Sequence, residues 1–92
     1  MQTTFMMDFR IADHFGESAI RDTYKRAFRE WKNDTVYITE LSLVLNWQIW
    51  RHWENGNDEI ARVYDELWRK NHSWCLDHLK GDDARYYFEV TD

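Results

Sequence analysis

Three glycines and the absence of proline divide this 92-residue chain into segments of helical length. A residue that readily adopts a positive φ commonly ends a helix, so Gly16, Gly56 and Gly81 are expected helix stops. Side-chain oxygens that can cap the next helix follow each glycine, in Glu17-Ser18, Asn57-Asp58 and Asp82-Asp83. Acids there also favour the helix dipole. Short joints of this kind predict antiparallel or sharply angled helices.

Hydrophobic residues recur at helical spacing between these stops. The second segment carries the stripe Ile20, Tyr24, Ala27, Phe28 and Trp31. The fourth segment alternates steps of four and three, as in a bundle seam, through Ile60, Tyr64, Leu67, Asn71, Trp74 and His78. We therefore expect one all-α domain spanning residues 1–92. It would be a compact bundle of about four helices, at 8–15, 17–32, 39–54 and 58–80, plus a short C-terminal helical turn.

The boundaries of the third helix and of the tail depend on weaker signals. Residues 33–38 are expected to form a break, with Thr39 capping the third helix. That helix should be the most enclosed, because the stretch from Leu41 to Leu45 is apolar nearly all round. The tail ARYYFEVTD also alternates like a strand that could pair with residues 35–39. We favour a helical turn over residues 83–88, because it follows a glycine and two aspartates.

Charge and cysteine content limit the function classes. The single cysteine, Cys75, cannot form an internal disulfide, and MQTTFMMDFR does not resemble a signal peptide. The longest uncharged run, residues 41–50, is too short to span a membrane. A cytoplasmic protein without membrane association is expected. The net charge of −5 disfavours nucleic-acid binding by the whole surface, although residues 1–33 carry +1 and residues 34–92 carry −6.

Three tryptophans stand at every third position of NWQIWRHW: Trp47, Trp50 and Trp53. Steps of three rotate a helix by about 300°, so the indoles fan over one broad face. Gln48, Arg51 and His52 fall on the other face. The favoured interpretation is a core helix whose C-terminal half packs on a neighbour. An exposed tryptophan platform for a ligand or a base is the alternative.

Three polar residues fall on predicted apolar faces. Asn46 lies between Trp50 and Trp53 on the helical wheel, and Asn71 and His78 lie in the seam of the fourth helix. A buried amide costs roughly 1–3 kcal/mol unless it is paired. We expect these groups to bond one another or the backbone. A small tryptophan-walled pocket for a small molecule is the functional alternative.

Arg21, Lys25, Arg29 and Lys32 form a basic stripe on the second predicted helix. The surrounding residues 10–32 partly fit a helix-turn-helix, with Ala12 four positions before Gly16. Glu17 and Asp22 stand where such motifs commonly carry apolar residues. A solvated charged face is the favoured interpretation. Contact with nucleic acid or with an acidic protein segment is the alternative.

No catalytic or metal motif stands out. His72, Cys75 and His78 are spaced by threes, so they differ by about 60° on the wheel and cannot easily face one ion. Neither a glycine-rich phosphate loop nor a serine elbow is present. The acids often sit one turn from a base, as in Arg62, Glu66 and Lys70, which usually supports a solvated helix. We expect no enzyme, no cofactor and no metal.

Several stretches carry a family resemblance: AFREWK, YITELSLVLNWQIW, YDELWRK and LKGDDARYYFEVTD. Together they resemble a family of small helical proteins from bacterial and phage genomes, a domain of unknown function. The resemblance covers roughly Phe15 onward. It implies a helical fold and a mobile-element context, and it brings no activity or site residues.

The sequence therefore predicts a small non-enzymatic interaction or regulatory protein that binds another protein or itself, as a homodimer. Sixteen aromatic residues exceed what a small core readily hides. The expected interaction surface is the outer edge of Trp47, Trp50 and Trp53 with Trp68 and Trp74. A nucleic-acid-binding regulator using the basic stripe is the first alternative. A small-molecule pocket around Asn46, Asn71 and His78 is the second.

Overall fold

The computed structural model describes residues 4–92, which form five helices. They are α1 (Thr4–Asp13), α2 (Glu17–Trp31), α3 (Thr35–Glu54), α4 (Asp58–His78) and α5 (Asp82–Thr91). The all-α fold is confirmed, and residues 4–92 contain no strand. The first three residues of MQTTFMMDFR lie outside the described range. Within that range, no helix has both the length and the apolar character needed to cross a membrane.

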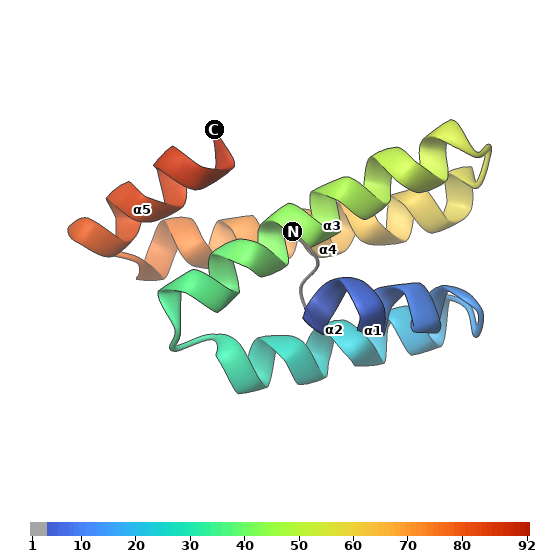
Figure 1. Cartoon of the computed structure of the whole chain (residues 1–92), viewed down its shortest axis with the longest axis horizontal. Coiled ribbons are helices and arrows are strands. Elements are labelled where there is room, and N and C mark those ends of the chain that lie inside the picture. The colour runs from blue at the N-terminus through green and yellow to red at the C-terminus, as the bar shows by residue number, and fades with distance from the viewer. Residues whose placement is uncertain (1–3) are drawn as a thin grey trace.

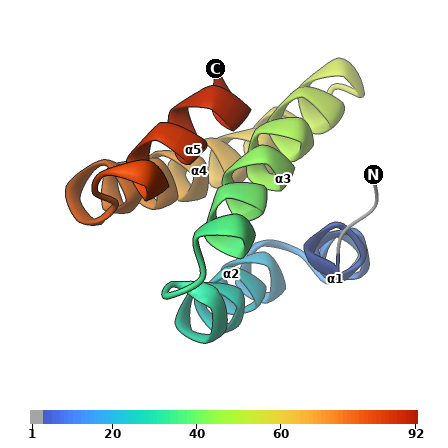
Figure 2. The same ribbon diagram turned by 60° about the vertical axis from the view of Figure 1, so that its left-hand side comes forward.

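The helices are arranged in layers around α3 (Figures 1 and 2). α3 and α4 form a long hairpin, α1 and α2 pack against one side of it, and α5 lies on the other side. α5 covers only the half of the hairpin that contains the start of α3 and the end of α4. α3 contacts each of the four other helices, and the enclosure expected for its stretch from Leu41 to Leu45 holds except at Leu43, which is 39% exposed.

α3 begins earlier than predicted because Asp34, and not Thr39, caps it. Asp34 is extended (φ −114°, ψ 110°), and its carboxylate accepts a hydrogen bond from the Tyr37 amide at 3.2 Å. That bond satisfies one of the free amides of the first turn. Thr39 is buried within the helix. The predicted break at residues 33–38 is therefore wrong, since only residues 32–34 separate α2 from α3.

The other boundaries also differ from the prediction in part. α1 spans residues 4–13 and not 8–15, so Phe15 lies in the following turn with 77% of its surface exposed. α4 ends at His78, because Leu79 is extended (φ −80°, ψ 134°). The C-terminal element is a full helix of ten residues and not a single turn. The chain thus has five helices in the described range, and α2 ends within one residue of the predicted position.

Each glycine lies in a joint between helices as predicted, but α4 ends at the extended Leu79 and not at Gly81, and the predicted side-chain caps do not form. Gly16 and Gly56 adopt φ angles of 96° and 78°, which glycine reaches without steric cost. Gly16 and Gly81 are themselves the N-cap residues of α2 and α5, and the side chain of Asn57 makes no capping bond to α4. The first turns of these helices do carry acids, which suit the helix dipole.

The core lies between α3 and its neighbours. Its predicted α2 stripe is confirmed, with Ile20, Tyr24 and Ala27 buried and Phe28 and Trp31 half-buried. The largest fully buried side chains include Phe9, Ile20, Ile38, Leu41, Leu45, Tyr64 and Tyr87. Two of them are tyrosines whose hydroxyls need partners in the interior. The core therefore includes polar clusters that tie the helices together.

Candidate functional site

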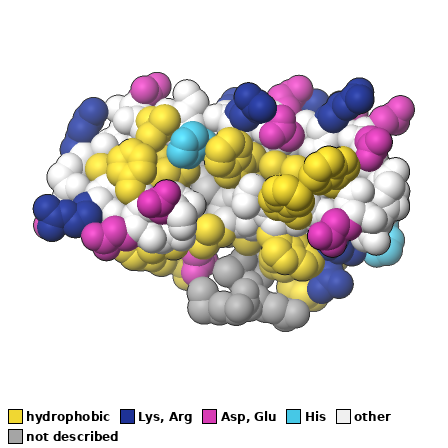
Figure 3. Space-filling view, turned by 90° about the horizontal axis from the view of Figure 1, so that it is seen from above, with side chains coloured by type: hydrophobic (Ala, Val, Ile, Leu, Met, Phe, Trp, Pro, Cys, Tyr) yellow, Lys and Arg dark blue, Asp and Glu magenta, His cyan; other side chains and the backbone are white. Residues whose placement is uncertain are grey.

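The three tryptophans of α3 face the solvent. Trp47, Trp50 and Trp53 keep 47%, 52% and 57% of their surface exposed, so the core interpretation of these residues is wrong. The Trp50 and Trp53 rings are tilted against each other with centroids 5.2 Å apart. The Arg51 guanidinium lies 5.8 Å from the Trp47 ring centroid. We call the three residues the tryptophan ridge. Hydrophobic side chains gather on the face that carries α3 and α5, with charged groups around them (Figure 3).

The polar residues between these tryptophans are the ones that α3 buries. Gln48 is 0% exposed and His52 is 7% exposed, although both were expected on the polar face. Because residues 48 and 52 lie one turn apart, they share a side of the helix opposite the ridge. That side faces α1 and α4. In the C-terminal half of α3, the side that faces the interior is therefore opposite to the side that hydrophobicity alone predicts.

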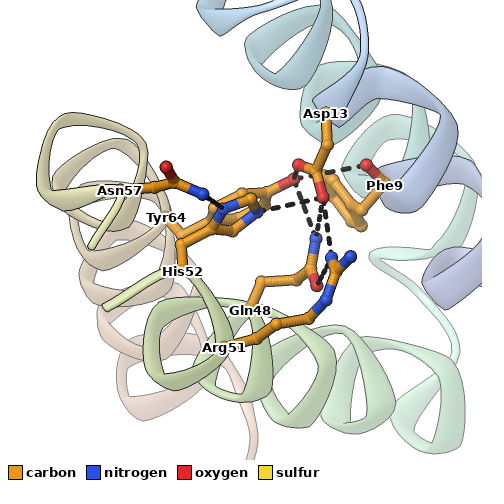
Figure 4. Close-up of polar contacts among 7 residues, drawn as sticks. All are labelled: Phe9, Asp13, Gln48, Arg51, His52, Asn57 and Tyr64. Atoms are coloured by element: carbon orange, nitrogen blue, oxygen red, sulfur yellow. Dashed lines mark hydrogen bonds and ion pairs between the residues drawn. The ribbon is translucent and has the colours of Figure 1, made fainter. Parts of the chain in front are cut away.

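Asp13, the last residue of α1, supplies the acceptor for this buried polar face (Figure 4). Its carboxylate accepts hydrogen bonds from Gln48 Nε2 at 2.9 Å and Arg51 Nη1 at 3.0 Å. The Tyr64 hydroxyl of α4 donates a third bond to it. The Asp13 side chain is only 10% exposed. Charge-assisted bonds are stronger than neutral ones. Because the acceptor lies on α1 and the donors lie on α3 and α4, the cluster joins these three helices at one point.

Two further contacts complete the Asp13 cluster. His52 Nε2 lies 3.0 Å from the Asp13 carboxylate, out of line for a hydrogen bond, and its ring stacks on Tyr64 with centroids 5.4 Å apart. The Asn57 amide lies 3.4 Å from His52 Nδ1. Burial, helped by the bond to Asp13, raises the pKa of the Tyr64 hydroxyl. The tyrosine thus stays protonated and able to donate. Since donors surround the carboxylate, the arrangement suits a structural clamp between helices.

A second polar cluster joins α2, α3, α4 and α5 around Asn71, which is fully buried as the seam pattern predicted. Its amide nitrogen donates to Ser42 Oγ at 2.7 Å and to the Ile38 carbonyl at 3.2 Å. Its amide oxygen accepts a bond from the Tyr24 hydroxyl at 3.2 Å. Tyr87 of α5 bonds to Ser42 at 3.0 Å. This cluster positions α5 on the hairpin.

The predicted pocket of Asn46, Asn71 and His78 is not assembled. Asn46 is exposed beside Trp68, and His78 is exposed with its ring stacked on Trp74 at 4.4 Å. His78 Nδ1 lies 2.9 Å from the Trp74 carbonyl. Only Asn71 points into the interior. The three residues therefore lie apart, and of the three only Asn71 is buried.

The five tryptophans of the predicted surface divide into two groups. Trp68 is half-buried and lines a hollow with Leu43 and Asn46 of α3, so it borders the ridge. Trp74 packs edge-on against Phe28 of α2, with ring centroids 5.3 Å apart. It thus belongs to the contact between α4 and α2. The surface available around the ridge comprises Trp47, Trp50, Trp53 and the edge of Trp68.

The basic stripe is interrupted by acids. Arg21 bonds to Glu17 at 2.9 Å and also to Glu66 of α4, and these bonds raise its pKa. Lys25, Arg29 and Lys32 are exposed. A hollow of about 550 Å³ between α1 and α2 is lined by Lys25, Arg26 and Arg29, but also by Asp8, Asp22 and the apolar Ile11 and Phe15. The stripe is therefore a mixed surface, and α1 and α2 form a packed helical hairpin.

The residues of the HxxCxxH segment have separate environments. His72 Nδ1 lies 2.7 Å from the Tyr87 hydroxyl, whereas His78 is exposed beside Trp74. Cys75 is 1% exposed, and burial raises the pKa of its thiol to about 11. No group of three or more potential metal-ligating side chains occurs among residues 4–92. At neutral pH the buried thiol is thus protonated and a poor nucleophile.

The Asp13 cluster was not found from the sequence. Gln48 and Tyr64 lie 35 and 51 residues from Asp13, and no local spacing signals such a contact. The one available hint was a run of polar residues, Gln48, Arg51 and His52, on a helix otherwise rich in large apolar side chains. Comparisons with protein-family models, curated proteins and solved structures find no match to this chain, so the family resemblance stays a prediction.

Proposed function

We propose that this chain is a non-enzymatic protein-interaction module that binds an apolar face of a partner protein through the tryptophan ridge. One observation carries the proposal: α3 buries Gln48 and His52 and leaves Trp47, Trp50 and Trp53 about half exposed. A helix that serves only its own core would be expected to do the opposite. Which process such binding would regulate depends on the identity of the partner.

The size of the ridge supports this proposal. With about 250 Å² for a whole tryptophan side chain, the three exposed fractions correspond to about 400 Å² of indole surface. An apolar patch of about 300–600 Å² on a monomer is often functional. Covering the ridge would contribute about 10 kcal/mol of apolar transfer free energy before the costs of association. Tryptophan is also enriched among the residues that dominate binding energy at interfaces.

A site-specific photocrosslink tests the proposal. A benzoylphenylalanine residue would replace Asn46, which is exposed next to the ridge, in the chain expressed in its native cells. We expect a discrete protein adduct that disappears when Trp50 and Trp53 are both replaced by alanine. The same crosslinker at Lys25, exposed on α2, is the matched control. Absence of an adduct at position 46, or one unaffected by the alanine replacements, would contradict the proposal.

A further inference from the structure

α5 occupies only part of the groove between α3 and α4. Its Tyr87 hydroxyl lies 3.0 Å from Ser42 Oγ of α3 and 2.7 Å from His72 Nδ1 of α4. A hollow of about 90 Å³ marks the end of α5, lined by Ser42, Leu43, Asn46, Trp68, His72 and Thr91. α5 is thus an example of an amphipathic helix that packs on this hairpin. It ends beside Asn46, where Thr91 lines the same hollow.

The same groove continues beyond α5 toward the turn between α3 and α4. On α3 the lining residues follow steps of four, three and four: Ser42, Asn46, Ile49 and Trp53. On α4 the same steps run backward through His72, Trp68, Asp65 and Ala61. Such steps keep side chains on one face of a helix. A second hollow of about 260 Å³ therefore extends the first, and no described helix lies over it (Figures 1 and 2).

The dimensions of the uncovered groove suit another short helix. From Asn46 to Glu54, α3 rises about 12 Å at 1.5 Å per residue. α5, which fills the covered half, has ten residues. The half-buried Ile49 and the buried Ala61 form an apolar floor, and Trp53 stands at the edge. An apolar stripe of two to three helical turns would cover these residues.

The charges around the uncovered groove favour a basic occupant. Asp58 lines the hollow, and the exposed Glu54 and Glu59 are the sequence neighbours of the lining residues Trp53 and Asp58; the three acids form no ion pair within residues 4–92. Asp65 also lines the hollow, but it is paired with Arg69 at 2.9 Å. Arg62 is the cation among the lining residues. The indole faces of Trp50 and Trp53 add an attraction for cations, as the contact of Arg51 with Trp47 illustrates on the same helix.

We propose that the uncovered half of the α3–α4 groove binds a short basic amphipathic helix of a partner protein. The apolar stripe of that helix packs on Ile49, Trp53 and Ala61, in line with α5. Its lysine or arginine side chains pair with Glu54 and Asp58. This inference rests on the proposed function and specifies the chemistry of the partner.

A model peptide tests the proposal directly. The probe is a fluorescein-labelled peptide of about 14 residues with leucine and lysine at helical period, and its control has glutamate in place of lysine. Binding to the full chain is measured by fluorescence anisotropy, and its location by the indole N–H resonances in ¹H–¹⁵N spectra. We expect saturable binding of the lysine peptide that shifts the Trp50 and Trp53 signals and not that of Trp31. The glutamate peptide should bind at least about tenfold more weakly.

Matched variants separate the charge and apolar contributions. Replacing Glu54 with Gln and Asp58 with Asn should weaken binding of the lysine peptide several-fold. The same changes at Asp83 and Glu89, exposed acids of α5, should leave binding unchanged. Trp50→Ala with Trp53→Ala should reduce binding more than about tenfold. Equal affinity for both peptides, or shifts confined to α1 and α2, would overturn the proposal.

The two proposals fail in different ways. An adduct at position 46 together with no peptide binding would retain the interaction surface and reject the basic helix. An adduct with the mass of two copies, with a dimer in light scattering that the Trp50 and Trp53 replacements dissociate, would also reject it in favour of a second copy of this chain. Loss of both the adduct and peptide binding would reject both proposals.

Discussion

The hydroxyl of Tyr64 on α4 donates a hydrogen bond to the carboxylate of Asp13, the last residue of α1. The same carboxylate accepts bonds from Gln48 and Arg51 of α3, so one side chain joins three helices. These bonds satisfy Gln48 on the side of α3 that faces the interior, which also carries the buried apolar residues of the first half of the helix. By holding Gln48 inward, they hold the neighbouring Trp47 outward. The exposed ridge and the buried cluster are thus two consequences of one helix orientation.

Replacing Asp13 with alanine should destabilise the fold by about 2–3 kcal/mol, because it leaves buried or half-buried donors without their acceptor. The free energy of unfolding would be measured by guanidinium denaturation, with the midpoint compared at constant m-value. Asp8, exposed on the same helix, is the control, and its replacement by alanine should change stability by less than about 0.5 kcal/mol. Equal effects of the two replacements would argue against the clamp.

Asn71→Ala should cost about 2 kcal/mol or more, because Ser42, Tyr24 and the Ile38 carbonyl lose a buried partner. The exposed Ser73 on the same helix provides a control that should be nearly neutral on replacement by alanine. Thermal unfolding followed by circular dichroism measures both. If Asn71→Ala were as stable as the wild type, the buried amide would have no role in positioning the helices.

Stability should fall at alkaline pH through the buried tyrosines and Cys75. Burial raises the pKa of Tyr87 from 10.0 to about 12 and that of Cys75 from 9.0 to about 11. The unfolded chain therefore loses these protons first, so the folded state binds more protons between pH 9 and 12 and loses stability as pH rises through that window. Guanidinium midpoints at pH 8 and 11 measure the effect.

The variant Tyr87→Phe isolates one contribution to this pH dependence. It should show a smaller loss of stability between pH 8 and 11 than the wild type, although it is less stable at pH 8 because the bond to Ser42 is absent. The half-buried Tyr86 supplies the matched control, Tyr86→Phe. A pH dependence identical in all three chains would show that the ionisation of Tyr87 is not linked to folding.

Trp50→Ala and Trp53→Ala should each reduce stability by about 1–2 kcal/mol, less than the loss of a core side chain, because about half of each indole already contacts water. Phe9→Ala, which empties a fully buried site, should cost about 3–5 kcal/mol. Urea denaturation of the three variants compares these values. A large loss from either tryptophan variant would mean that its indole contributes to the core and not to an available surface.

The sequence predicted several helix ends and seams correctly, because these depend on local geometry. Gly16 and Gly56 take the positive φ that ends a helix, and the stripe of α2 and the position of Asn71 follow from helical periodicity. The start of α3 was missed although its signal was local. Asp34 and Thr39 are both acceptable N-caps, and only the observed bond to Tyr37 distinguishes them.

The orientation of α3 depended on the tertiary structure. From hydrophobicity alone, Trp47, Trp50 and Trp53 belong inside and Gln48 and His52 outside. Burying a polar side chain is acceptable when partners satisfy it, and for Gln48 these partners, Asp13 and Tyr64, come from α1 and α4. The sequence by itself therefore determined that the chain forms helices and where several of them end. The buried apolar stripe of the first half of α3 continues into Gln48 and His52, and only the tertiary structure supplies the partners that keep Gln48 inside and leave the tryptophans in solvent.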